Sequence, residues 1–172
     1  MILQGSPEMN PDEFEALIQV MNAPLLILMI GLPGSGKSTW TRRNASGAIV
    51  VSQDDLIDAI TPLGFEYSAR PIYAAAEEFI ARAALAAGRS VIVDRTNRTP
   101  ALRARWVAIG QEAQCKVVAL VMSTDVETCR TRNRARTGQR RVSEERMDRM
   151  IAAFERPTLD EGVYAIREIT GD

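Results

Sequence analysis

Six consecutive large apolar residues, Leu25–Ile30, are followed at once by a segment with three glycines in six positions, Gly31 to Gly36. An apolar run this short, bounded by Pro24 and Gly31, predicts a β-strand buried on both faces. Such strands occur in parallel sheets that are covered by helices on both sides. The chain is therefore expected to fold as an α/β protein in which a glycine-rich loop follows a central strand.

The rest of the sequence alternates in the same way. Apolar runs predict further strands at residues 48–52, 91–94 and 115–122, and a last strand is expected at residues 163–169. Amphipathic or alanine-rich segments predict helices at residues 10–21, 38–44, 54–60, 71–87, 99–110, 125–136 and 143–154. Strands that alternate with helices indicate βαβ units and a parallel sheet of about four to five strands with helices on both faces. We expect one domain over residues 25–172, preceded by a helical extension at residues 1–24.

Composition narrows the class of protein. The 172 residues are 46% hydrophobic and 25% charged, and the formal net charge is −1. These values are typical of a globular domain. No apolar run approaches the ~20 residues of a membrane span, so no membrane partner is expected. The chain has no histidine, which excludes His-ligated zinc sites and Ser–His catalysis. It has two cysteines, Cys115 and Cys129, which we expect to be reduced thiols in a cytoplasmic protein.

The glycine-rich segment satisfies the pattern G-x-x-x-x-G-K-[ST] between a strand and a helix, which is the context of a phosphate-binding P-loop. Backbone N–H groups of such a loop surround an anionic phosphate at a helix N-terminus. Lys37 is expected to reach the β- and γ-phosphates, and the Ser38 hydroxyl to ligate Mg²⁺. The predicted nucleotide-binding residues are Gly31, Pro33, Gly34, Ser35, Gly36, Lys37, Ser38 and Thr39.

Two absent features favour transfer of the phosphoryl group to a bound acceptor. The third strand ends in Asp94-Arg95, whereas water-activating ATPases usually carry an acid after this aspartate. With only Lys37 and Lys116 as lysines, the chain has no Asn-Lys-x-Asp string, the guanine-binding motif of GTPases. Asp94, at the carboxyl end of a strand, is expected to order Mg²⁺ or its waters.

A carboxylate that accepts the acceptor's hydroxyl proton is expected near the loop. Asp54 and Asp55 follow the second strand and are both candidates. Either could instead cap the helix that begins there. The residues alone leave the choice between Asp54 and Asp55 open.

Arginines accumulate in the last third of the chain: Arg130, Arg132, Arg134, Arg136, Arg140, Arg141, Arg146 and Arg149. Arg132 and Arg136 are spaced i, i+4 and would share a helix face. A helical hairpin with these side chains could form a lid that neutralises charge on the transferring group. The alternative is a solvated hairpin salt-bridged through Glu144, Glu145 and Asp148, and we favour it for Arg146 and Arg149.

At this point the chain resembles the polynucleotide 5′-hydroxyl kinases, both phage-type and mammalian. The likeness rests on GLPGSGKSTW, Gln53-Asp54-Asp55, Val93-Asp94-Arg95-Thr96-Asn97, Arg132-Asn133-x-x-Arg136, Arg103-Ala104-Arg105-Trp106 and the tail from Phe154 to Gly162. It covers roughly residues 25–169. The resemblance implies a P-loop kinase fold with a helical lid, ATP and Mg²⁺ as donor and cofactor, and nucleic acid 5′-OH ends as acceptor in a repair reaction.

The resemblance also implies residue roles. It selects Asp54 as the general base, Lys37 and Ser38 as phosphate and metal residues, and Arg132 and Arg136 as lid arginines. The phage-type enzyme has an acceptor-binding arginine three positions after its base, where this chain has Ile57. Possible replacements are Arg70, Arg95, Asn97 and Arg98. Two other functions stay open, a P-loop kinase for a small-molecule hydroxyl (sugar, nucleoside or antibiotic) and a nucleotide-binding regulatory module.

Overall fold

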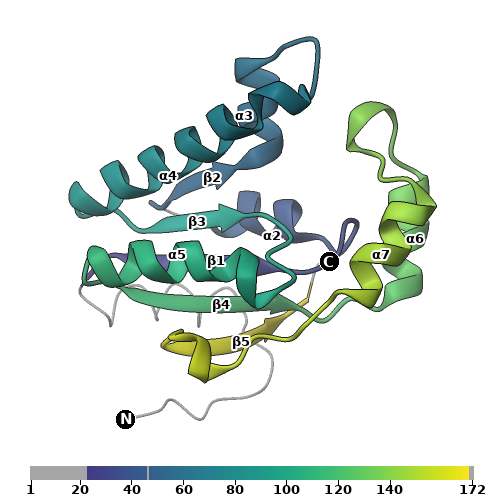
Figure 1. Ribbon diagram of the computed structural model, residues 1–172. Coiled ribbons are helices and arrows are strands. Elements are labelled where there is room, and N and C mark those ends of the chain that lie inside the picture. Colours follow the sequence, from purple (N-terminus) through teal and green to yellow (C-terminus); the bar gives the residue numbers. More distant parts are fainter. Residues whose placement is uncertain (1–22, 46, 171–172) are drawn as a thin grey trace.

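A computed structural model describes residues 23–45 and 47–170 and shows a parallel sheet between layers of helices (Figure 1). The strands are β1 (Leu25–Ile30), β2 (Ile49–Ser52), β3 (Val91–Asp94), β4 (Lys116–Met122) and β5 (Ala165–Ile169). The α-helices are α2 (Lys37–Asn44), α3 (Gln53–Ile60), α4 (Arg70–Ala86), α5 (Pro100–Glu112), α6 (Val126–Arg134) and α7 (Glu144–Ala152). The α/β prediction is confirmed, while the helix predicted at residues 10–21 lies outside the described residues.

The five strands are all parallel, in the order β2-β3-β1-β4-β5. The strand that carries the glycine-rich loop is therefore central. The register pairs Ser52 with Asp94 and Ile30 with Val121, so the carboxyl ends of β2, β3, β1 and β4 meet at one edge. This edge is where α/β sheets place their ligands.

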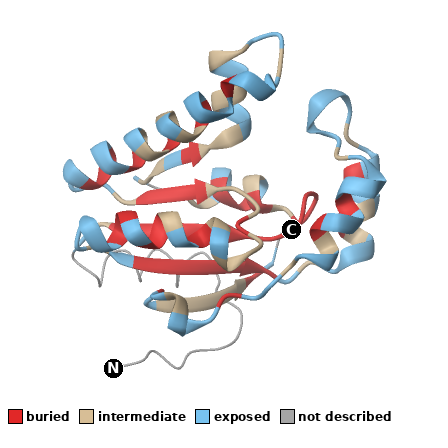
Figure 2. Ribbon diagram, in the orientation of Figure 1, coloured by how far each residue is buried: buried red, intermediate tan, exposed pale blue. Residues whose placement is uncertain are grey.

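Helices cover both faces of the sheet because β1 is apolar on both. Leu26 and Leu28 pack with residues of α4 and α5, including Trp106. Leu25 and Ile27 face the other way and pack with Trp40 of α2. All six residues of β1 have 0% exposed surface, and Figure 2 shows the central strands buried along their length.

Helices α6 and α7 form a hairpin that stands at the carboxyl edge of the sheet (Figure 1). Its inner side is apolar: Cys129, Met147 and Met150 pack against Leu32 of the glycine-rich loop. The helical lid of the predicted fold is thus present and is anchored directly on that loop.

Some predicted boundaries were wrong. Helix α6 ends at Arg134, so Arg136 lies beyond it, because the Asn133 amide bonds the backbone of Val142 on the returning chain. Helix α5 continues past Gly110, where a Cβ would lie 2.3 Å from a Val117 methyl carbon. That glycine permits close helix–sheet packing and does not end the helix.

Two further observations concern residues 23–45 and 47–170. Cys115 and Cys129 are both free thiols, as predicted. No helix in these ranges is both long and apolar enough to span a membrane.

A buried arginine ties the C-terminal segment to the core. Arg103 of α5 has 0% exposed surface. Its Nε and Nη2 donate to both carboxylate oxygens of Glu161 at 2.6 and 2.7 Å, and its Nη1 donates to the carbonyls of Asn97 and Glu155. One side chain thereby joins α5, the loop after β3 and the tail that leads into β5.

We expect Glu161→Gln to lower the free energy of unfolding by on the order of 3 kcal/mol, because it leaves the Arg103 charge buried without its partner. The hydrogen bond from Arg103 lowers the pKa of Glu161 below the ordinary value of 4.5. Its stabilisation is therefore present above that value and is lost as the pH falls. Urea denaturation at pH 7 and pH 3 should show the difference between wild type and variant shrinking in acid.

The matched control is Glu112→Gln, which removes the exposed Arg82–Glu112 pair. Exposed ion pairs contribute little, so no clear change in unfolding midpoint is expected. Equal losses from the two variants would show that burial of Arg103 is not what makes the pair important.

Candidate active site

The P-loop closes around its own lysine. Gly34 and Gly36 have φ of 86° and 95°, which glycine adopts without strain. Lys37 Nζ donates to the carbonyls of Gly31 and Leu32 at 2.9 and 2.7 Å and to Ser35 Oγ at 3.2 Å. These bonds use all three donors of the ammonium group.

Lys37 is buried, and this sets its electrostatics. Burial lowers its pKa from 10.5 to about 8; the negative charge of Asp94 opposes this shift and the positive charge of Arg136 adds to it. Arg136 therefore lies close enough to the P-loop to affect its lysine. Arg136 therefore still belongs to the site, although it lies beyond the end of α6.

Ser38 and Asp94 form the second part of the site. The Ser38 hydroxyl lies close enough to the Asp94 carboxylate to affect it: burial raises the pKa of Asp94, and Ser38 and then Lys37 oppose this shift. A hydroxyl and a carboxylate side by side are hard oxygen donors of the kind that Mg²⁺ binds together with nucleotide phosphates. The described residues contain no group of three His, Cys, Asp or Glu that could hold a metal by themselves. The donor set therefore fits an ion shared with a nucleotide.

The structure separates the two candidate bases at the start of α3. Ser52 caps the helix by accepting from the Asp55 N–H at 3.3 Å, so neither aspartate is the cap. Asp55 is paired with Arg140 at 3.4 Å, while the exposed Asp54 carboxylate forms no hydrogen bond or ion pair with a described side chain. The charge of Asp54 nevertheless acts on both Lys37 and Asp94.

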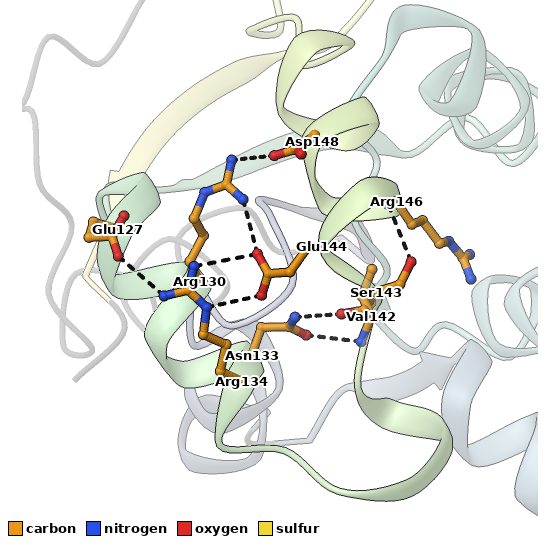
Figure 3. Close-up of polar contacts among 9 residues, drawn as sticks. All are labelled: Glu127, Arg130, Asn133, Arg134, Val142, Ser143, Glu144, Arg146 and Asp148. Carbon is orange, nitrogen blue, oxygen red and sulfur yellow. Dashed lines mark hydrogen bonds and ion pairs between the residues drawn. The ribbon is translucent and has the colours of Figure 1, made fainter.

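The lid hairpin is held by a salt-bridge network on its outer side (Figure 3). Arg130 pairs with Glu144 and Asp148, and Arg134 pairs with Glu144 and Glu127. The buried Asn133 donates to the Val142 carbonyl at 2.7 Å and accepts from its N–H at 3.0 Å. A salt-bridged hairpin thus exists, built from Arg130 and Arg134.

Arg132 and Arg136 are related to the P-loop through Cys129. Both positive charges act to lower the pKa of Cys129, which burial nevertheless raises. Cys129 is in contact with the P-loop, where a Cβ on Gly34 would lie 2.3 Å from its carbonyl oxygen. The charges of both predicted lid arginines therefore act on Cys129, the residue of α6 that contacts the P-loop.

The tip of the lid, the 3-10 turn Gly138–Arg140, docks on the far side of the site. Arg140 pairs with Asp58 at 2.8 Å as well as with Asp55. The Gln139 side chain accepts from Phe65 N–H at 2.7 Å and donates to the Leu63 carbonyl at 3.2 Å. The lid is thus fastened to α3 and to the loop that follows it.

The four candidate acceptor-binding residues lie in different surroundings. Arg70 stacks on the Tyr67 ring at 5.3 Å, and Arg95 pairs with the buried Glu77. Asn97 is only 2% exposed and its amide donates to the Met29 carbonyl, which gives it a structural task. Arg98 is partly buried, and its Nε is buried without a hydrogen-bond partner among the described residues.

Sequence reasoning missed Glu77, Gln139 and the structural roles of Asn133 and Asn97. Glu77 lies in an alanine-rich helix, yet it is fully buried and accepts from both Arg95 and Arg105. In the sequence, the role of Glu77 is indicated only by the presence of one acidic residue on an otherwise apolar helix face. Gln139 gave no signal, since its partners are backbone groups 74 and 76 residues away.

Comparison with known families places this site in context. The sequence pattern of the AAA domain family matches residues 26–157, which includes the P-loop, both aspartates and the lid. The chain belongs to the AAA domain family. This AAA domain has a P-loop kinase fold, with the five-stranded parallel sheet and the covering helices described above.

The individual proteins that this chain resembles carry different names. A bifunctional polynucleotide phosphatase/kinase of Schizosaccharomyces pombe is 28% identical over 149 residues, which cover 84% of this chain and 33% of that protein. The chain thus spans about a third of the length of this curated relative. A putative kinase of Chloroflexus aurantiacus superposes with a TM-score of 0.67 at 20% identity, covering 88% of this chain and 87% of that one. Chaetomium thermophilum Kti12, in complex with ADP-AlF3, gives 0.65 at 20% identity, covering 86% and 89%.

The lowered pKa of Lys37 makes a measurable prediction. A polyphosphate beside the ammonium group would raise its pKa again, so nucleotide binding above pH 8 should take up part of a proton. Isothermal titration calorimetry with ADP in buffers of different ionisation enthalpy should show this uptake growing from pH 7 to pH 9. The Ser38→Ala variant keeps Lys37 and serves as control, with uptake of the same size. A proton uptake that does not change with pH would show that the pKa of Lys37 is not lowered into this range.

Proposed function

We propose that the protein is an ATP-dependent kinase that transfers the γ-phosphoryl group to the 5′-hydroxyl end of DNA or RNA. The observation that carries this proposal is the unpaired Asp54 carboxylate, whose charge acts on Lys37. A carboxylate beside a P-loop, without a partner of its own, is suited to accept a hydroxyl proton. The 28% identity to a polynucleotide phosphatase/kinase supports the choice of a nucleic acid acceptor.

The proposed reaction uses each part of the site. The acceptor's 5′-oxygen attacks the γ-phosphorus, its proton passes to Asp54, and the bond from the γ-phosphorus to the β–γ bridging oxygen breaks to release ADP. Lys37 binds the β- and γ-phosphate oxygens in exchange for its contacts within the loop. Arg132 and Arg136, from the lid, stabilise the charge of the transferring group.

Ser38 and Asp94 are the residues that would hold Mg²⁺. The ion would supply positive charge to the β- and γ-phosphate oxygens. Asp94 is suited to this task because burial raises its pKa, a penalty that a nearby cation relieves.

A kinase for a small-molecule hydroxyl remains the second candidate, because the same fold and the same base would serve it. Labelled ATP offered with 5′-OH DNA, 5′-OH RNA, a nucleoside 3′-monophosphate and several small alcohols distinguishes the two. Transfer to the oligonucleotides and the mononucleotide is expected, and transfer only to a small alcohol would overturn the proposal. Nucleotide binding without transfer to any acceptor would instead favour a regulatory module.

We expect Asp54→Asn to lower kcat by about 10²–10⁴-fold while the affinity for ATP stays within a few-fold of wild type. The loss follows from removing the proton acceptor while keeping the side chain's size. Steady-state kinetics with a 5′-OH oligonucleotide, combined with ATP binding by calorimetry, measure both quantities.

Asp55→Asn is the matched control, since Asp55 is the neighbouring carboxylate and is already paired with Arg140. Its kcat should fall much less. If Asp55→Asn is the more damaging variant, the roles of the two aspartates are exchanged.

Arg132→Ala and Arg136→Ala should each slow transfer to every acceptor, including a nucleoside 3′-monophosphate, by about 10²-fold or more. Their charge is needed at the γ-phosphate, whatever molecule receives it. The control is Arg134→Ala, which removes an arginine of the outer salt-bridge network. If the loss of activity in the first two variants depends on the length of the acceptor strand, these arginines contact the acceptor and not the phosphoryl donor.

A further inference from the structure

The P-loop is held from two sides by the segments that follow the neighbouring strands. On one side, the Gly31 N–H donates to the carbonyl of Thr96, in the loop after β3, at 3.1 Å. On the other side, the Thr124 hydroxyl donates to the carbonyl of Ser35 at 2.8 Å. Thr124 lies between β4 and α6, where the lid leaves the sheet (Figure 1). Of these two contacts, only the second depends on a side chain.

The hydrogen bond from Thr124 fixes more than one carbonyl group. The Ser35 carbonyl and the Gly36 N–H belong to the same peptide unit, and the described part of the chain has no cis peptide bond. In a planar trans peptide unit the C=O and the N–H point in opposite directions. A fixed Ser35 carbonyl therefore also sets the direction of the Gly36 N–H.

The backbone at this point has little preference of its own. Gly36 has a φ of 95°, and glycine occupies positive and negative φ about equally well. The peptide unit before Gly36 can therefore turn over with little steric cost, which would reverse its N–H. Lys37 Nζ also holds Ser35, by donating to its Oγ at 3.2 Å, but in the proposed reaction Lys37 exchanges its loop contacts for phosphate oxygens. The bond from Thr124 needs no such exchange.

The direction of the Gly36 N–H matters because this residue stands at the start of α2. Gly36 is the N-cap of that helix, and as a glycine it has no side chain with which to cap it. Backbone N–H groups at such a helix start are the groups that surround a nucleotide phosphate in a P-loop. Turning the peptide unit over would remove one of these donors and direct the partial negative charge of the Ser35 carbonyl oxygen toward the anion.

We propose that Thr124 is a positioning residue for nucleotide binding: its hydroxyl holds the Ser35–Gly36 peptide unit in the orientation in which the N–H faces the nucleotide phosphates. This inference rests on the nucleotide-binding part of the proposed function and is independent of the acceptor. It also makes the root of the lid part of the phosphate site, since Thr124 belongs to the segment that leads into α6.

The test compares the affinity for ADP and ATP, measured by calorimetry with Mg²⁺ present, in wild type, Thr124→Val and Thr124→Ser. Thr124→Val keeps the shape of the side chain and removes the donor, so Kd for both nucleotides should rise by about 5- to 20-fold. Thr124→Ser keeps the hydroxyl and should bind them nearly as wild type does. An unchanged affinity in Thr124→Val, or an equal loss in both variants, overturns the proposal.

Ser123→Ala is the matched control. The neighbouring Ser123 hydroxyl donates to the Ile169 carbonyl at 3.2 Å, in β5, which β4 separates from β1. Thr124→Val and Ser123→Ala each lose one hydroxyl-to-carbonyl bond, so their unfolding midpoints should fall by similar small amounts. Only Thr124→Val should lose affinity for the nucleotides. An equal loss of affinity in Ser123→Ala would assign the effect to general destabilisation and overturn the proposal.

A measurement without nucleotide distinguishes failure of this inference from failure of the proposed function. NMR relaxation dispersion of the Gly36 amide detects turning of the peptide unit on the microsecond-to-millisecond timescale. Exchange is expected in Thr124→Val and not in wild type or Ser123→Ala. If Thr124→Val shows this exchange and binds nucleotide weakly, while wild type phosphorylates no nucleic acid, the positioning role stands and the proposed acceptor is wrong. If wild type phosphorylates 5′-OH ends and Thr124→Val changes neither measurement, the proposed function stands and the positioning role is refuted.

Discussion

The complete burial of β1 is the constraint on which the rest of the molecule depends. A six-residue strand with no exposed surface needs hydrogen-bonding neighbours on both edges and apolar cover on both faces. Strands β3 and β4 supply the edges, α4 and α5 cover one face, and α2 covers the other. Because β1 is central, the loop that follows it emerges in the middle of the carboxyl edge, between the loop that follows β3 and the lid that follows β4.

The charges at this edge fall into two kinds. Some arginines have matched carboxylates and hold segments together, as Arg103 does with Glu161 and Arg130 with Glu144. Other charged groups, Asp54 and Arg98 among them, have no partner in the described chain. Lys37 has only neutral acceptors in the loop. Leaving charges unmatched costs stability, and such costs concentrate at functional sites.

Local patterns predicted the architecture well. Four of the five strands were marked by an apolar run bounded by glycine, proline or polar residues, whereas β5 contains Arg167 and Glu168. The P-loop residues are consecutive in the chain. Residues paired over long distances in sequence were much harder to recognise. Nothing local indicates that the Gln139 side chain meets the backbone of Leu63 and Phe65, because these contacts depend on how the lid returns to the sheet.

Two further features could not be predicted from the pattern of residues: where each helix ends, and how the adjacent Asp54 and Asp55 differ. The 3.6-residue pattern of α6 continues to Arg136, but the side chain of Asn133 bonds Val142 and the helix stops. Asp54 and Asp55 are chemically equal neighbours. The folded structure distinguishes them, because Arg140 pairs with Asp55 and the charge of Asp54 acts on Lys37.

The docking of the lid tip on α3 has a mechanical consequence. The hairpin that carries Arg132 and Arg136 touches α3, the helix that presents Asp54, through Arg140, and touches the loop after that helix through Gln139. Swinging this hairpin outward requires breaking the contacts with Asp58 and with the backbone of Leu63 and Phe65. The segment that carries Arg132 and Arg136 and the helix that carries Asp54 are therefore mechanically coupled, so a movement of the hairpin disturbs contacts of both.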